Sequence, residues 1–194
     1  MNMNIKSSQR VISKVSHNSL AYDILEILAL ISLGALGVIM HAKLRIPMGI
    51  PGKWGLVYMA LLVGGRLLSK KQYASSLLSI GAGFMFFIPV LGYYDPLLPL
   101  SYLLPGIILD LGYYLISKKH PSFIMLAVVC GISYLSIHLF RYTIFEIGFS
   151  TGILSYPYHS ALKNGFIFPL ITHFLFGLSG GVIGYGAIKL FKKK

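Results

Sequence analysis

The stretch Lys43-Leu-Arg-Ile-Pro-Met-Gly-Ile-Pro-Gly-Lys-Trp54 interrupts a chain that otherwise consists of one apolar segment after another. It holds three cations, two prolines, two glycines and the only tryptophan. Clustered prolines and glycines mark a loop, so this stretch separates two helical segments. We expect the three cations of this loop to have a functional role, because the segments on either side are mostly apolar.

The composition places the chain in a membrane. Of its 194 residues, 56% are hydrophobic and 11% are charged, which is too apolar for a water-soluble domain of this size. The net charge of +12 is typical of cations that flank membrane spans and fix their orientation. It does not indicate nucleic-acid binding, because no Lys/Arg cluster accompanies the soluble aromatic platforms that bind single strands.

Six segments are apolar enough to form membrane spans, each of which needs about twenty residues. They cover residues 22–42, 54–68, 73–92, 97–117, 122–142 and 165–190. The sequence therefore predicts an all-α membrane protein, a six-transmembrane-helix bundle. We expect a basic N-terminal segment over residues 1–20, a single transmembrane domain over 21–190 and a basic tail over 191–194.

The positions of Lys and Arg set the predicted orientation, because short cytoplasmic loops carry an excess of these residues. With the N-terminus inside, the inner segments hold 12 of the 17 cations and the outer segments hold five. This bias predicts cytoplasmic N- and C-termini in a multi-pass membrane protein. Three of the five outer cations lie in the 43–54 loop.

Polar side chains gather on the outer half of the predicted bundle. Tyr134, His138 and Arg141 share one helix face by their three- and four-residue spacing. Ionisable groups at membrane depth usually face the bundle interior or water, so we expect an outward-opening pocket for a small anionic or polar molecule. The predicted ligand-binding residues are Arg141, His138, His41, His173, Arg45, Lys53, Trp54, Tyr58, Tyr93, Tyr134 and Lys163.

Arg141 is the predicted centre of this site, because its planar fork binds a carboxylate or phosphate through two nitrogens. The aromatic residues would form the walls. A different interpretation is interfacial: Trp, Tyr and Arg also anchor helices at the lipid headgroups without binding any ligand.

Asp110 is the only carboxylate well inside a predicted span. Arg66 lies at a similar depth on the second span. Because an unpaired carboxylate at that depth would become protonated, we expect a structural ion pair between the two. A proton relay would need further carboxylates in line, and the sequence has none.

Histidines on several spans leave a haem-binding redox subunit open as an alternative. His138 with His173 is the natural pair of ligands for a b-type haem, or His41 with either; a metal site from the same residues is also open. A ligand-free accessory subunit of a larger membrane complex is the remaining alternative. No catalytic motif or P-loop is present, so we expect neither enzymatic activity nor a cofactor otherwise.

Three stretches carry a further signal. They are Leu36-Gly-Val-Ile-Met-His-Ala-Lys-Leu-Arg-Ile-Pro47 with the loop that follows, Pro105-Gly-Ile-Ile-Leu-Asp-Leu-Gly112, and His173-Phe-Leu-Phe-Gly-Leu-Ser-Gly-Gly-Val-Ile-Gly-Tyr185. Together they resemble the integral-membrane substrate-binding (S) components of energy-coupling factor (ECF) vitamin transporters. The Ile-Pro-x-x-x-Pro spacing is similar to that of the biotin-type members.

The resemblance implies a function in vitamin uptake, in the plasma (inner) membrane of a prokaryote. In that family the first outer loop closes over the ligand, so residues 43–54 would form a lid. The resemblance also implies partners in the bilayer, namely a membrane coupling subunit with two ATPases that drive transport.

Overall fold

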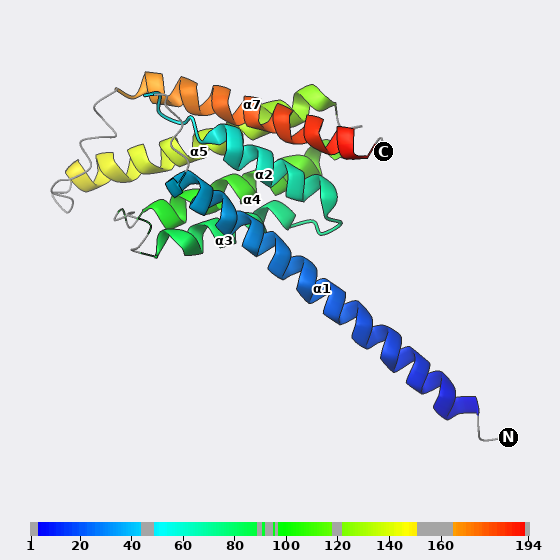
Figure 1. The fold of residues 1–194 in the computed structure, drawn as a ribbon. Helices are drawn as coiled ribbons and strands as arrows, with labels where there is room; N and C mark the ends of the chain where they lie inside the picture. Colours follow the sequence, from blue (N-terminus) through cyan, green and yellow to red (C-terminus); the bar gives the residue numbers. More distant parts are fainter. Residues whose placement is uncertain are drawn as a thin grey trace.

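The computed structural model describes residues 4–43, 49–88, 91, 95, 97–117, 122–150 and 165–192. Within these ranges the chain is all-helical, without a strand, so the all-α prediction is confirmed for them. The helices are α1 (Asn4–Lys43), α2 (Gly55–Leu68), α3 (Ala74–Phe86), α4 (Leu98–Ser117), α5 (Phe123–Ser150) and α7 (Ile167–Phe191) (Figure 1).

Four helices are long and apolar enough to cross a membrane. They are α1 over Leu20–Lys43, α4 over Leu98–Ile116, α5 over Phe123–Gly148 and α7 over Ile167–Phe191. The helices α2 and α3 are apolar but have only 14 and 13 residues. At about 1.5 Å per residue they are about 21 and 20 Å long. Helix length alone therefore supports four of the six predicted spans.

The helices and the predicted spans have different bounds at three places. α1 begins at Asn4, before the predicted span at 22–42, and its N-terminal part extends away from the bundle (Figure 1). The apolar part of α1, Leu20–Lys43, agrees with that span. α5 continues to Ser150 rather than 142, and α3 ends at Phe86 rather than 92. Residues 4–21 contain neither Pro nor Gly, so nothing in the polar segment ends the helix where the apolar residues stop.

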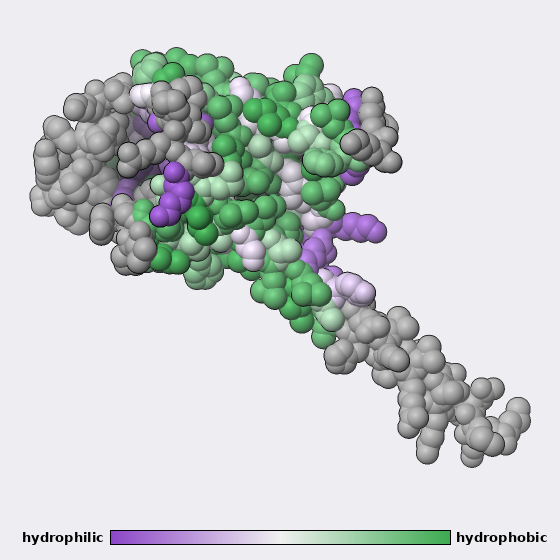
Figure 2. Space-filling model, in the orientation of Figure 1, coloured by the Kyte–Doolittle hydropathy of each residue, from purple (hydrophilic) through white to green (hydrophobic). Residues whose placement is uncertain are grey.

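The surface of the bundle is apolar. Every helix exposes large apolar side chains, among them Leu28, Leu68, Phe84, Leu111, Ile124 and Ile183. Figure 2 shows this apolar surface across the visible face of the bundle, with hydrophilic residues at its two ends. An exposed apolar belt of this extent is suited to lipid, which agrees with the prediction of a membrane protein.

Small residues lie where the helices cross. The closing helix α7 has two such rows: Gly177 with Gly181, and Gly180 with Gly184. The first row faces α5, since a Cβ on Gly181 would lie 2.6 Å from Cys130 Sγ. The second row faces α2, since a Cβ on Gly184 would lie 2.6 Å from the Ala60 carbonyl oxygen. α7 thus packs closely between α5 and α2, as small residues allow in membrane helices.

Candidate ligand-binding site

A pocket of about 380 Å³ lies at the end of the bundle where α1 ends and α2, α4 and α7 begin. We call this end the pocket end. Four helices and the segment 49–54 contribute to its wall. The lining residues are His41, Ile50, Pro51, Gly52, Lys53, Trp54, Leu98, Tyr102, Tyr134, Ile137, His138, Arg141, Pro169 and His173.

Most of the predicted ligand-binding residues meet at this pocket. Seven of the eleven line it: His41, Lys53, Trp54, Tyr134, His138, Arg141 and His173. Tyr58 does not line it and lies beneath it, next to His41 and Tyr102 in a small adjoining cavity. Arg45, Tyr93 and Lys163 lie outside the described residues.

One wall of the pocket is a stack of three rings. Tyr134 and His138 lie one turn apart on α5, and His173 of α7 lies between them. The ring centroids of Tyr134 and His173 are 5.3 Å apart, and those of His173 and His138 are 5.4 Å apart. The interplanar angles of 23° and 28° make this a nearly parallel stack, which gives this wall of the pocket an aromatic surface.

The backbone sets the orientation of both histidines. His173 Nδ1 donates to the Pro169 carbonyl oxygen at 2.7 Å, and His138 Nε2 donates to that of Phe166 at 3.2 Å. In the neutral tautomer the other ring nitrogen is an acceptor. Each histidine therefore keeps one nitrogen that can accept a hydrogen bond from a ligand.

The segment 49–54 covers another side of the pocket. The Trp54 ring lies against His41, with centroids 4.4 Å apart. Gly52 has a φ of 80°, a conformation that glycine adopts without strain. A Cβ on Gly52 would also lie 2.9 Å from His173 Nδ1, so only glycine lets this backbone approach α7 so closely. This half of the predicted lid packs against the stacked rings; residues 44–48 lie outside the described part.

Arg141 forms an ion pair that the sequence did not predict. Its Nη2 donates to Asp95 Oδ2 at 2.6 Å. Asp95 lies just before α4, in the one predicted outer loop that carries no cation. That absence was the available signal, because an isolated carboxylate at the outer end of the bundle is a natural counterion for a cation on another helix.

Tyr102 lines the pocket and is hydrogen-bonded to Tyr58 beneath it. The Tyr58 hydroxyl donates to the Tyr102 carbonyl oxygen at 2.7 Å and shares a hydrogen bond with Ser79 Oγ at 2.9 Å. Sequence reasoning missed Tyr102, although it lies two helical turns before Asp110 and thus on the same inward face of α4.

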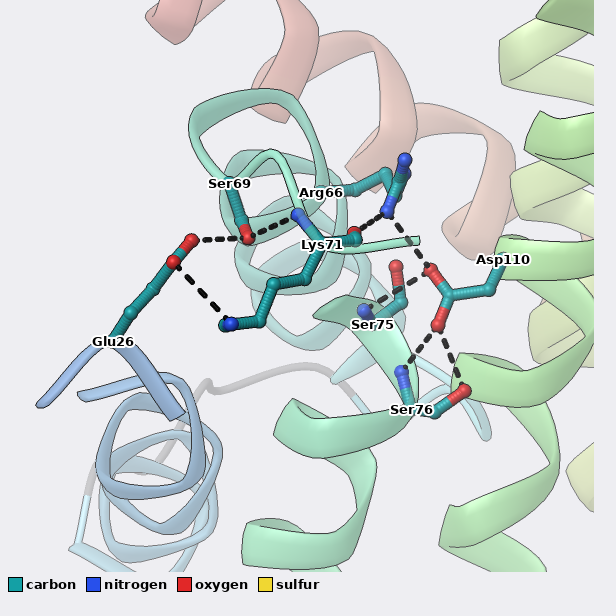
Figure 3. Close-up of polar contacts among 7 residues, drawn as sticks. All are labelled: Glu26, Arg66, Ser69, Lys71, Ser75, Ser76 and Asp110. Carbon is teal, nitrogen blue, oxygen red and sulfur yellow. Dashed lines mark hydrogen bonds and ion pairs between the residues drawn. The ribbon is translucent and has the colours of Figure 1, made fainter. Parts of the chain in front are cut away.

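A polar network occupies the opposite end of the bundle, which we call the network end (Figure 3). It comprises Asp23, Glu26, Arg66, Ser69, Lys71, Ser75, Ser76 and Asp110. Along α1, Glu26 is fifteen residues from His41, which is about 22 Å of helix. Pocket and network are therefore well separated.

Arg66 and Asp110, the predicted ion pair, lie together in this network at 3.9 Å between Nη1 and Oδ1. The shorter contacts of the carboxylate are with α3: the amides of Ser75 and Ser76 donate to it at 3.1 and 2.7 Å, and Ser76 Oγ donates at 2.7 Å. Asp110 thus caps the N-terminus of α3 from a neighbouring helix, where a negative charge is stabilised.

Arg66 is held by two further contacts. It donates a hydrogen bond to the Lys71 carbonyl oxygen and lies 4.6 Å from the ring centroid of Tyr113. Lys71 Nζ in turn donates to Asp23 Oδ1 at 2.9 Å. The hydrogen bond to that carboxylate raises the pKa of Lys71 above its usual value. These contacts join α1, α2 and α4 at the network end.

The geometry bears on the haem and metal alternatives. Within the described ranges, no group of three or more His, Cys, Asp or Glu side chains is placed to hold a metal ion. The rings of His138 and His173 stack on one another, whereas two axial ligands of a haem must approach the iron from opposite faces of the macrocycle. This pair does not fit a bis-histidine haem.

The pocket therefore combines a guanidinium, an ammonium, imidazoles and aromatic faces. Such a set can bind an acid group at Arg141 and an apolar portion against the stacked rings. The chemistry of these residues is the basis for assigning a function. No family model, curated protein or solved structure matches this chain.

Proposed function

We propose that this chain is a membrane-embedded binding subunit that captures a small anionic or polar molecule from the outer face of a prokaryotic plasma membrane. The observation that carries the proposal is the pocket of about 380 Å³ in which Arg141 meets the histidines and Trp54. Small-molecule sites span about 300–1,000 Å³, so the pocket suits a compact ligand. In this proposal all six helices span the membrane and both termini are cytoplasmic.

Each wall has a role in the proposed binding. Arg141 and Lys53 neutralise the acid group of the ligand. The row of rings from Tyr134, His173 and His138 contacts its apolar portion. The segment 49–54 acts as a lid, which is supported by the contact of Gly52 with His173 and of Trp54 with His41.

The resemblance to ECF S components extends the proposal to uptake of a micronutrient or vitamin. The chain would then work with a membrane coupling subunit and ATPases, because it has no nucleotide-binding motif of its own. The lid-like segment beside the pocket supports this extension.

The test is to identify small molecules that co-purify with the protein. After gentle solubilisation, mass spectrometry of the denatured eluate should find an acid-bearing molecule with the wild type and lose it with Arg141→Ala. Arg141→Lys keeps the charge without the planar fork and should retain less than the wild type. Lys189→Ala, a cation at the end of α7 far from the pocket, is the control and should retain the full amount. Equal retention by folded Arg141→Ala would refute the assignment.

A further inference from the structure

We propose that Asp95 is a latch on Arg141: in the ligand-free protein its carboxylate holds the guanidinium, and the acid group of a ligand must replace it. The inference rests on the proposed function, because it concerns the same pocket. It adds a residue that sets which anions the pocket admits.

The contact between the two residues uses only part of the guanidinium. Arg141 Nη2 donates to Asp95 Oδ2 at 2.6 Å, while the neighbouring Nε is buried and has no hydrogen-bond partner among the described residues. Arginine can present two parallel N–H groups to the two oxygens of a carboxylate, which gives a stronger contact than one. In the contact with Asp95, Arg141 therefore donates from Nη2 but not from Nε.

Asp95 does not contact both Nη2 and Nε of Arg141, because its other oxygen atoms are hydrogen-bonded to the start of α4. Its other oxygen, Oδ1, accepts the Leu97 amide at 2.9 Å, and its carbonyl oxygen accepts the Leu98 amide at 3.2 Å. The carboxylate is thus divided between the start of α4 and Arg141. A ligand carboxylate or phosphate is not hydrogen-bonded to the start of α4, so two of its oxygens can accept hydrogen bonds from Nη2 and Nε of Arg141.

The exchange has two consequences for the pocket. While Asp95 is in place, its charge cancels that of Arg141, so the pocket attracts simple monoatomic anions weakly. When a ligand replaces Asp95, the ion pair between the residue before α4 and α5 is broken. Leu98 at the start of α4 lines the pocket, so this part of the wall can adjust to the bound molecule.

Trp54 allows a test without knowledge of the ligand. It is the only tryptophan and lines the pocket, so its fluorescence reports on that site. Iodide serves as an anionic quencher and acrylamide as a neutral one. Asp95→Asn removes the charge but retains an oxygen for the Leu97 amide. Glu146→Gln is the matched control, because it removes an equal charge from an exposed residue of the same pocket-end half of α5.

We expect Asp95→Asn to raise the iodide quenching constant by at least about twofold over wild type, because the uncovered guanidinium concentrates anions. Acrylamide quenching should not change, Glu146→Gln should match wild type, and the double variant Asp95→Asn/Arg141→Gln should lose the gain. Equal effects of Asp95→Asn and Glu146→Gln, or no effect of either, would overturn the latch. A rise with both quenchers would also overturn it, by assigning Asp95 a purely structural role.

Arg141→Gln alone separates the two proposals. A fall in iodide quenching with an unchanged Asp95→Asn variant would reject the latch and keep the anion-binding pocket. Unchanged iodide quenching in Arg141→Gln would reject the anion-binding pocket itself.

Discussion

Gly34 of α1 and Leu78 of α3 meet backbone to backbone: a Cβ on Gly34 would lie 1.8 Å from the Leu78 carbonyl oxygen. The contact is reciprocal one turn away, where a Cβ on Gly81 would lie 1.9 Å from the Ile31 carbonyl oxygen. Neither clash can be relieved by rotating a side chain. The packing of α1 against α3 therefore requires glycine at both positions, because any other residue would place a Cβ where the neighbouring backbone lies.

Gly34→Ala should destabilise the protein strongly, because α1 and α3 must separate to admit the methyl group. Overpacking of this kind costs about 1–3 kcal/mol, occasionally more. The measurement is the thermal unfolding midpoint in detergent. The control is Gly64→Ala on α2, where an added Cβ meets nothing within 4 Å and no loss is expected. A loss as large in Gly64→Ala would contradict the explanation.

Asp110→Asn should also lower stability, because the asparagine cannot accept all the hydrogen bonds of the α3 cap. An unsatisfied buried donor costs about 1–3 kcal/mol. Ser76→Ala removes only one of the three donors and should cost less. The thermal unfolding midpoints of the two variants check the order. If Ser76→Ala were the more damaging change, the carboxylate would not be the centre of the cap.

The Lys71–Asp23 pair predicts a pH dependence at the alkaline end. The folded-state pKa of Lys71 is raised above its ordinary value of 10.5. Its contribution to stability is therefore fully present below pH 10.5 and is lost as the pH rises through the higher folded-state value. The unfolding midpoint of the wild type should fall more steeply above pH 10.5 than that of Lys71→Met. Parallel curves would show that the pair contributes nothing.

Cysteine labelling tests the proposed orientation. Cys130 is fully buried, so the native protein gives little background. Lys53→Cys lies at the pocket end and should react with a membrane-impermeant maleimide on intact cells. Lys192→Cys lies at the network end, where Lys192 Nζ donates to the Leu67 carbonyl oxygen, and should react only after the cells are opened. The reverse pattern would invert the proposed topology.

The sequence predicted seven of the fourteen residues that line the pocket, and helical spacing accounts for part of this. Tyr134, His138 and Arg141 share one face of α5 whatever the packing, and the charged loop had to lie at a helix end. Helical spacing could not identify Asp95 as the partner of Arg141, because that contact depends on how the start of α4 is placed against α5.

The fold was predicted less completely at the network end. Arg66 and Asp110 were recognised as neighbours from their depth alone. The role of Asp110 as a cap for α3 requires knowing where α3 begins and which way α4 faces it, and neither is encoded in local spacing. The apolar pattern predicted the membrane-spanning part of α1, Leu20–Lys43, but it carries no information on how far the helix continues into the polar segment.

The short helices α2 and α3, which contact each other, have a consequence for the surrounding lipid. A bilayer core is about 30 Å thick, so in the proposed bundle this flank falls short of it by about 9–10 Å. Acyl chains beside it must compress, at a cost of fractions of a kcal/mol for each ångström of mismatch. The lipid is therefore expected to be thinner beside α2 and α3 than beside the longer helices α5 and α7, and acyl-chain length becomes a determinant of the stability of this part of the bundle.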